Sequence, residues 1–242
     1  MENRDKNLII WPIFVDHDAM KKLVLTVSVM ALLLSGCDFK GENKDLVVGN
    51  GLRLTTTRPY SSGFDKLVLK NSYDGTVELQ KSSEFTVKAD ANILEHVKSS
   101  VSNGVLTVNN AKELLPTNDI EVSIRTGQLK EISLNFASEI RVLSISADAL
   151  TVNLSDAAKL TLSGQVNQLT VVASGTTNLD ATGLTAQKVS LTQTGKSVAK
   201  VYAMTEVLAN LQAESLAEIF GNPPKVEQNV ASTAKLIHET AI

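Results

Sequence analysis

The sequence has little of the material from which most active sites are built. Its 242 residues include one cysteine, three histidines and one tryptophan, and aromatic residues make up only 4%. A single cysteine excludes an internal disulfide and any site with several thiolate ligands. The formal net charge of −3 gives no electrostatic reason to bind nucleic acid. We therefore expect no nucleic-acid partner, no cofactor and no metal, and the composition points away from an enzyme.

The first 36 residues are typical of an export signal. Residues 1–19 mix charged and apolar groups without helical order. Met20 is followed by two lysines and then by an apolar run of 12 residues, 23–34. This length is inside the roughly 7–15 residues of a secretory signal and short of the ~20 needed to span a bilayer. We predict that translation begins at Met20, that residues 1–19 are a non-structural upstream extension, and that 20–36 form a signal peptide.

The sequence Leu-Ser-Gly-Cys at 34–37 resembles the lipobox of bacterial lipoproteins. The resemblance implies cleavage between Gly36 and Cys37 and attachment of lipid, palmitate included, to Cys37. Asp38 resembles the signal that retains lipoproteins in the inner membrane of enteric bacteria. It favours the periplasmic face of the inner membrane, with the outer membrane as the open alternative. Residues 39–44 are polar and glycine-containing, and 37–46 are expected to form a flexible lipidated tether.

An internal period runs through the second half of the chain. Apolar residues recur at spacings of 20, 19, 19, 19 and 19, at Ile140, Leu160, Leu179, Val198, Ala217 and Leu236. A second, mostly apolar series lies six residues earlier, at Leu134, Leu154, Ala173, Thr192, Leu211 and Val230. Stretches such as 150–154 alternate apolar and polar residues, as half-buried strands do. The period predicts a solenoid whose units each contain two short strands and two turns.

The fold expected from this period is all-β, a parallel β-helix with coils of about 19–20 residues and a handedness that the pattern leaves open. Leucine-rich repeats have similar periods. They require an asparagine or cysteine ladder and a convex helix, and neither pattern occurs in the repeats.

The chain before the repeats also has strand patterns, and no linker separates the two parts, so we expect one β domain over 47–242. A short helix is expected over 91–97 with Asp90 as its N-cap, and Asn103-Gly104 predicts a hairpin turn. The expected strands are 52–57, 66–70, 76–80, 84–89, 105–109 and 120–126.

Several stretches resemble the bacterial head-GIN domain, a family labelled putative auto-transporter adhesin. The resemblance covers about 48–238 and is most specific at 62–67, Ser-Gly-Phe-Asp-Lys-Leu. It implies an envelope-exposed β-helical domain, common on lipoproteins, with no established activity. The family's repeated Ser-Gly-Ser-Gly-Asp-Val turn is degenerate in this chain. Further matching stretches are 49–51, 58–59, 89–92, 104–108, 129–134 and 221–223.

Catalytic or metal-binding groups are not brought together by the repeat pattern. Asp148, Asp156 and Asp180 fall in different columns of the repeat, and His96 and His238 have no spaced partner. A further column mixes signs and types and is typical of a solvated face: Glu139, Lys159, Asn178, Ser197, Leu216 and Lys235. Catalytic and metal-binding residues are therefore expected to be none, and the ligand-binding residues are left open.

Together these patterns predict a lipid-anchored envelope protein with a non-catalytic binding, adhesin-like or scaffolding role. The partners would be the membrane, through the anchor, and a glycan or an envelope protein. Phe136 and Phe220 are either an exposed pair for sugar stacking or core and turn residues. Charges in the last coil, 226–238, and Pro223-Pro224 favour a monomer. The alternative is a carbohydrate-active enzyme acting on envelope polysaccharide, which needs two or more carboxylates in one groove.

Overall fold

The computed structural model describes residues 46–60 and 62–239. The chain divides into two units, Met1–Lys44 and Asp45–Ile242, and only the second is described below. The predictions about Met20, the signal peptide, Gly36, Cys37 and Asp38 all fall outside the described residues. Within the described ranges, no helix is long and apolar enough to cross a membrane.

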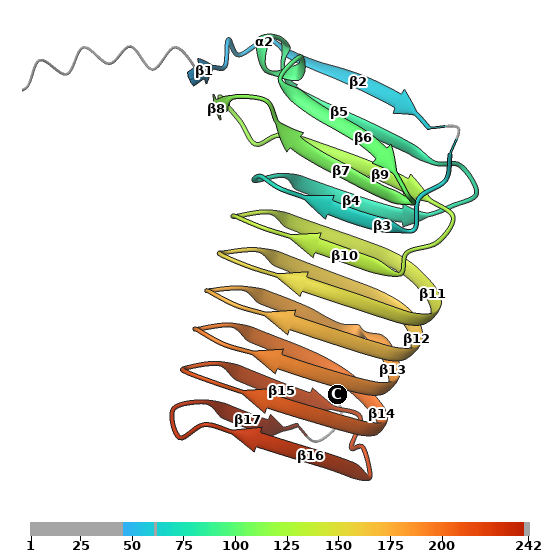
Figure 1. The fold of residues 1–242 in the computed structure, drawn as a ribbon, viewed down its shortest axis with the longest axis vertical. Helices are drawn as coiled ribbons and strands as arrows, with labels where there is room; N and C mark the ends of the chain where they lie inside the picture. The colour runs from blue at the N-terminus through green and yellow to red at the C-terminus, as the bar shows by residue number, and fades with distance from the viewer. Residues whose placement is uncertain (1–45, 61, 240–242) are drawn as a thin grey trace, which may run out of the picture. The chain divides into compact units, whose positions relative to one another are not determined.

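The second half of the chain is a stack of parallel coils, as predicted (Figure 1). Each coil pairs with the next in a parallel ladder, so strands β10 to β17 follow one another down the stack. The bounds are β10 Glu131–Leu134, β11 Glu139–Leu154, β12 Lys159–Ala173, β13 Asn178–Gln193, β14 Val198–Leu211, β15 Leu216–Phe220, β16 Lys225–Val230 and β17 Lys235–His238.

The coils differ from the expected pair of short strands. Strands β11, β12, β13 and β14 each run for 14–16 residues and bend around one edge of the stack without a break. The bend is accommodated by register shifts, for example between Val142 and Ile145 in β11. Ser144 takes a φ of 60° there. Because the backbone turns through a bulge, the ladder is hardly interrupted, and one long strand replaces the predicted second turn.

The tight turns at the opposite edge form a column of left-handed residues. Phe136, Asp156, Gly175, Gly195 and Ala213 occupy equivalent turn positions with φ between 58° and 83°. A Cβ at Gly175 would lie 2.5 Å from the carbonyl oxygen of Asp156, so glycine is required there by contact as well as by φ. The residues of the degenerate family turns thus still adopt the left-handed backbone conformation that the stack requires at this position.

The predicted inward column is correct except at one coil. Ile140, Leu160 and Leu179 are register partners and are at most 2% exposed. The next partner is Ala199, which is buried, and the predicted Val198 points away from the core. The coil that begins at Leu179 holds one residue more than predicted, which is taken up by register shifts in β13 and β14.

The same one-residue shift corrects the other two columns. Gln193, which is 1% exposed, replaces Thr192 in the second inward column. Val198 replaces Ser197 in the outward column, and Ser197 is buried. The apolar pattern favoured Val198 over Ala199 as the inward residue. It also missed Gln193, six residues before Ala199, because the buried side chain there is an amide.

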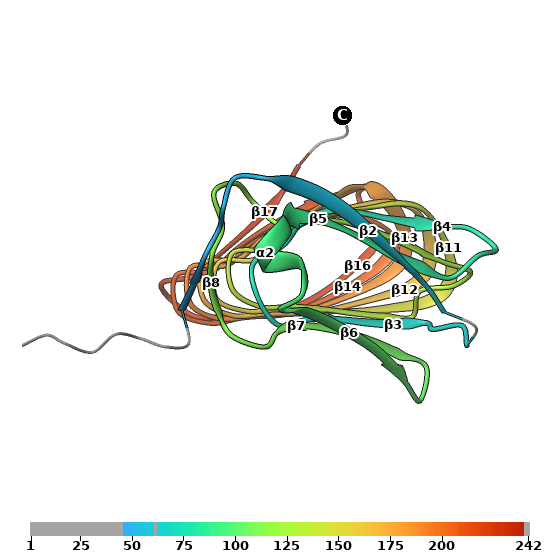
Figure 2. The same ribbon diagram turned by 90° about the horizontal axis from the view of Figure 1, so that it is seen from above.

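The first half of the domain continues both walls of the stack and closes its end (Figures 1 and 2). One wall adds β3, β7 and β6 to β10, and the other adds β4, β9, β5 and β2 to β11. The remaining pair, β1 and β8, forms a separate two-stranded sheet. The bounds are β1 Leu46–Val48, β2 Arg53–Pro59, β3 Lys66–Leu69, β4 Asp74–Leu79, β5 Glu84–Asp90, α2 Ala91–Leu94, β6 Val97–Ser102, β7 Val105–Asn110, β8 Glu113–Leu115 and β9 Glu121–Thr126.

All six strands expected in this half are present, and β1, β6 and β8 were not predicted. The hairpin turn at Asn103-Gly104 is confirmed, with φ of 51° and 75° between β6 and β7. The helix is one turn, because Val97 already belongs to β6. Asp90 makes no side-chain cap hydrogen bond; its carboxylate binds Thr117 instead.

Candidate functional site

Three adjoining hollows form a groove along the edge where β11, β12 and β13 bend, and we call it the edge groove. Their volumes are about 350, 770 and 430 Å³. Gly127 and Gln128 line both the first and the second hollow, and Ser146, Ala147 and Asp148 line both the second and the third. The groove therefore runs along the stack, and its levels, about 4.8 Å apart, are set by the ladder spacing.

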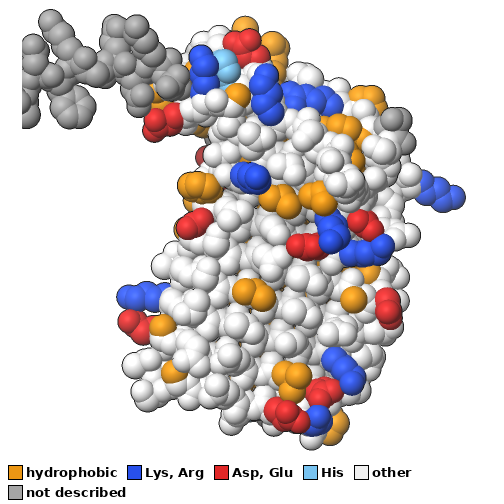
Figure 3. Space-filling view, in the orientation of Figure 1, with side chains coloured by type: hydrophobic (Ala, Val, Ile, Leu, Met, Phe, Trp, Pro, Cys, Tyr) orange, Lys and Arg blue, Asp and Glu red, His pale blue; other side chains and the backbone are white. Residues whose placement is uncertain are grey.

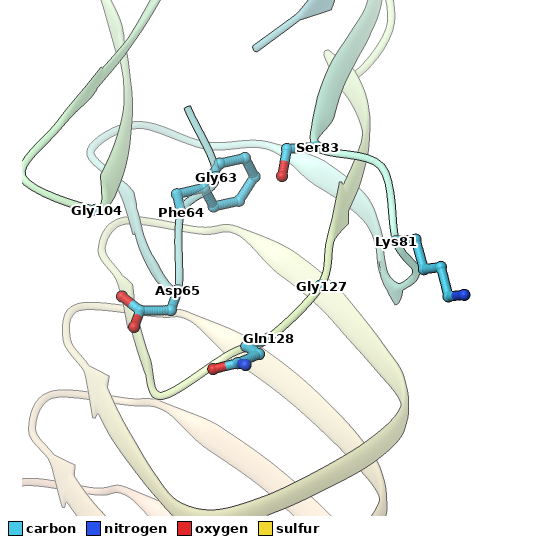
Figure 4. Close-up of a pocket in the computed structure, with 8 residues that line it drawn as sticks. All are labelled: Gly63, Phe64, Asp65, Lys81, Ser83, Gly104, Gly127 and Gln128. Carbon is cyan, nitrogen blue, oxygen red and sulfur yellow. The ribbon is translucent and has the colours of Figure 1, made fainter. Parts of the chain in front are cut away.

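The upper end of the edge groove is built by the Ser-Gly-Phe-Asp-Lys-Leu stretch (Figure 4). Phe64 is 4% exposed and packs edge-on against Tyr60, with ring centroids 6.3 Å apart. The hydroxyl of Thr126 donates a hydrogen bond to the Phe64 carbonyl. In Figure 4, the side chain of Lys81 points away from the hollow, whereas Asp65 and Gln128 flank it.

The middle of the edge groove carries charges that neutralise one another. Lys130 Nζ lies 2.6 Å from Asp65 Oδ2, and Lys66 Nζ lies 3.1 Å from Glu131 Oε2. On the face seen in Figure 3, acidic and basic side chains likewise gather in small mixed groups. A ligand in this part of the groove would meet paired charges and not a field of one sign.

The lower end of the edge groove is lined by a polar row, one residue per coil. Asp148, Asn167 and Gln187 follow one another at spacings of 19 and 20 residues. Asn167 Nδ2 donates to Asp148 Oδ1 at 2.6 Å, and the Thr205 hydroxyl donates to the Gln187 carbonyl at 2.6 Å. All three members of the row are exposed. They offer carboxylate and amide groups that can accept and donate hydrogen bonds to a ligand.

This row was not identified from the sequence, although the repeat contained the signal. Asp148 has no carboxylate at the equivalent position of the next coils and looks isolated. Asn167 and Gln187 lie outside the three columns that the period predicts. A search for amide and hydroxyl residues at the same spacing would have found the row.

The other expected residues do not join a site. Asp156 accepts a hydrogen bond from the Phe136 backbone N–H, and Asp180 binds the N–H and hydroxyl of Thr182. His96 lies 3.4 Å from Glu95, and His238 ends the last strand. Within residues 46–60 and 62–239, no three His, Cys, Asp or Glu side chains gather to hold a metal ion.

The suggested aromatic pair is not formed. Phe136 is 53% exposed at a turn of the first complete coil, whereas Phe220 is 8% exposed near the other end of the stack. Phe136 is thus a turn residue and Phe220 a buried one, which agrees with the second alternative and not with an exposed pair. The left-handed backbone of Phe136 and the turn column hold it outward.

A separate hollow of about 450 Å³ lies on the opposite wall, and Asp74 and Glu121 both line it. They are register partners on the neighbouring strands β4 and β9. Burial, together with the nearby Asp119, raises the pKa of the Asp74 carboxyl. The Glu121 carboxylate lies 2.8 Å from Arg53 and 3.2 Å from Lys88. The two carboxyl groups therefore sit in different electrostatic surroundings.

Solved structures share this fold at low sequence identity. A protein titled a putative adhesin from Parabacteroides merdae is 19% identical with a TM-score of 0.53, and another from Bacteroides fragilis is 14% identical with a TM-score of 0.60. A protein titled a putative lipid binding protein, from Parabacteroides distasonis, is 15% identical with a TM-score of 0.50. The matches cover 80–81% of this chain and 99% of each of those chains. No curated protein matches the chain.

A family model described as "Putative auto-transporter adhesin, head GIN domain" matches residues 63–223, more than half of the 242. The match begins at the stretch that builds the upper end of the edge groove and extends over the stacked coils. Because the family model matches more than half of the chain, including the parallel coils, the chain belongs to this family of putative auto-transporter adhesins with a head GIN domain.

Proposed function

We propose that this protein is an exported lipoprotein of the bacterial cell envelope that binds a glycan strand in the edge groove without transforming it. The observation that carries the proposal is the continuity of the edge groove over several coils. A groove that crosses successive coils suits an extended ligand better than a compact one. The adhesin description of the family supports a binding role.

The chemistry of the edge groove favours an uncharged, hydroxyl-rich ligand. The two lysines in its middle, Lys130 and Lys66, are paired with carboxylates, so this part of the groove offers a polyanion no excess positive charge. The side chain of Lys81 points away from the upper hollow (Figure 4). The row of Asp148, Asn167 and Gln187 supplies acceptors and donors at a regular spacing. Sugar hydroxyls donate and accept hydrogen bonds, so a repeating glycan can meet a repeating row of such groups. The other proposed partner is an envelope protein, whose extended polar segment would meet the same row of donors and acceptors.

The binding test compares two double variants of the full chain on a panel of envelope glycans. Asn167→Leu with Gln187→Leu removes two members of the polar row. Thr194→Leu with Gln212→Leu places the same exposed leucines at the tight-turn edge, away from the edge groove. We expect affinity for the bound glycan to fall about tenfold or more in the first variant only, because two hydrogen-bonding side chains are lost. Equal affinities in both variants would place the ligand elsewhere.

The proposed anchor is tested separately. Cys37→Ser should abolish labelling by a fatty-acid probe, since it removes the thiol that would carry the lipid. Deletion of residues 1–19 should leave export intact if Met20 is the start. Replacing Asp38 should shift the protein from the inner to the outer membrane if that residue directs sorting. Unchanged labelling of Cys37→Ser would refute the lipid anchor at Cys37. The binding role would then still be tested by the glycan panel.

A carbohydrate-active enzyme is the second candidate, and the pairing of Asp74 with Glu121 favours it. Glycoside hydrolysis uses one carboxyl group of raised pKa as the acid and a second, ionised carboxylate. Asp74 has a raised pKa and Glu121 is held by two cations. Turnover of the glycan panel that disappears in both Asp74→Asn and Glu121→Gln would establish this activity. Binding without turnover by the unaltered chain favours the first proposal.

A further inference from the structure

Half of the large hydrophobic side chains that are exposed in the described residues lie at one end of the stack. Of ten such side chains, five belong to the first strands and their partner: Leu46, Val48, Leu52, Leu54 and Leu115. They are 38–60% exposed. The other five are spread singly over later coils, where isolated exposed hydrophobics need no explanation. We call the first group the end patch.

Four members of the end patch are close along the chain, and the fifth is joined to them across a ladder. Leu46 and Val48 are alternate residues of β1, and Val48 is the register partner of Leu115 in β8. Leu52 immediately precedes β2 and Leu54 is the second residue of that strand, and both side chains are exposed. The elements that carry them lie at the closed end, where Figure 2 looks down on β2, α2 and β8.

Polar contacts hold the backbone of the end patch in place. Arg53, between the two leucines, donates to the carbonyls of Asn118 and Asp119 at 3.0–3.1 Å. Asn92 donates from Nδ2 to the Val48 carbonyl and accepts from the Asn50 N–H. The exposed apolar side chains are therefore presented on a fixed backbone, and their exposure does not come from a poorly packed segment.

We propose that the end patch docks on the surface of the lipid bilayer in which the protein is anchored, and this step rests on the proposed lipid anchor. Only eight residues lie between Cys37 and Leu46, so the two are nine positions apart in the chain. Nine residues span at most about 30 Å when fully extended, so a lipidated Cys37 keeps Leu46 close to the membrane. Leu46, the last residue of the tether, is also the first residue of the end patch. Lipid therefore covers the surface that the tether brings nearest to it.

Docking of this end has a consequence for the edge groove. The closed end would rest on the lipid, and the coils would extend away from it. The polar row of Asp148, Asn167 and Gln187 belongs to later coils and would stay accessible from the aqueous side. Partly buried apolar side chains at a membrane interface add affinity to a lipid anchor, and two such signals together give stable attachment.

The test uses single tryptophan reporters in the full chain, with Trp11→Phe removing the natural tryptophan. Leu52→Trp and Leu54→Trp place reporters in the end patch. Ser100→Trp places one on exposed β6, near the same end but outside the patch, and Leu208→Trp places one on a distant coil. Each protein is reconstituted in vesicles of phosphatidylcholine and phosphatidylglycerol, with and without brominated acyl chains. Lipidation is measured on the same samples with a fatty-acid probe.

We expect brominated chains to quench most of the fluorescence of Leu52→Trp and Leu54→Trp and little of that of the other two. Equal quenching of Ser100→Trp would overturn the proposal, because the domain would then tumble on its tether. Absence of quenching at both patch reporters would also overturn it, including the case in which a second copy covers the patch. Absence of labelling by the fatty-acid probe would contradict only the proposed lipid anchor. Quenching of the two patch reporters by an excess of brominated vesicles would then still show whether the end patch contacts lipid.

Discussion

The buried carboxylate of Asp90 accepts hydrogen bonds from both the backbone N–H and the hydroxyl of Thr117, at 2.8 and 2.7 Å. Thr117 lies 27 residues further along the chain, just after β8. Gly49 packs so closely on this carboxylate that a Cβ there would lie 2.1 Å from Oδ2. Asp90 therefore ties together the segments around β1, β5 and β8 at the closed end of the stack.

The charge of Asp90 should stabilise the domain at neutral pH. The hydrogen bonds from Thr117 lower the pKa of this carboxyl below its ordinary value. A lowered folded-state pKa contributes stability above the ordinary value of about 4, and this contribution is lost as the pH falls through the lowered pKa. We expect Asp90→Asn to lower the melting temperature at pH 7, and the difference from the unaltered chain to shrink in acid. Thermal unfolding followed by circular dichroism at pH 7 and pH 3 measures both. A difference that grows in acid would contradict this role.

The stacked leucines should each carry a large share of the stability. Leu160 and Leu179 are at most 2% exposed and are register partners in adjacent coils. Replacing either with alanine leaves a cavity and should cost about 2–5 kcal/mol in the free energy of unfolding. Val172→Ala, at a residue of β12 that is 45% exposed, is the control and should change it by less than about 0.5 kcal/mol. Denaturant titration measures all three, and equal effects would mean that the inward register is wrong.

Gly75 should not tolerate a side chain, although its φ is ordinary. A Cβ at Gly75 would lie 1.8 Å from the carbonyl oxygen of Val122 on the paired strand β9. Gly75→Ala must push the two strands apart and should cost about 1–3 kcal/mol or more. Gly63→Ala, whose Cβ meets only Ser83 Oγ at 3.8 Å, should be close to neutral. Comparison of the two melting temperatures checks the contact, and a neutral Gly75→Ala would contradict it.

The last coil should resist pairing with other chains because of its charges. In the described residues β17 pairs only with β15, so its outer edge carries unpaired backbone groups. Lys235 begins this strand and Glu239 follows it, and charges at an edge disfavour strand addition. Lys235→Val with Glu239→Val should promote oligomers or fibres, measured by light scattering. Lys196→Val with Glu214→Val, at a pair on the turn edge, is the control. A stable native dimer formed through this coil would contradict the predicted monomer.

The sequence was sufficient to predict the architecture, because a stack of coils repeats the same packing requirement every 19 or 20 residues. The exception at Ala199 shows the limit of that argument. Val198 is the more apolar residue, yet Ala199 is buried and Gln193 replaces Thr192. The Gln193 amide donates to the Ser197 hydroxyl at 3.2 Å and to the Leu216 carbonyl at 3.3 Å, so its burial is partly compensated by hydrogen bonds. Such bonds are not visible in a hydrophobic pattern.

The closed end and the edge groove were harder to predict for a different reason. β1 and β8 are three-residue strands that pair across more than sixty positions, and no local pattern identifies them. The edge groove combines side chains from the first strands with a row from the repeats. Its lower row follows the period and could be found. Its upper part depends on how Gly127 and Gln128 connect β9 to β10, which only the three-dimensional arrangement supplies.

Among residues 46–60 and 62–239, the parallel ladders join each repeat coil only to the coil before it and the coil after it. Such an assembly behaves as a chain of nearest-neighbour couplings, in which an inner coil has two supporting interfaces and a terminal coil has one. The antiparallel strands β2 and β5 cover one terminus, whereas in the part of the chain that the structure describes β16 and β17 each pair on one side only. Opening should therefore start from the last coil and progress inward, and amide protons should exchange fastest in β17 and slowest in the middle of the stack.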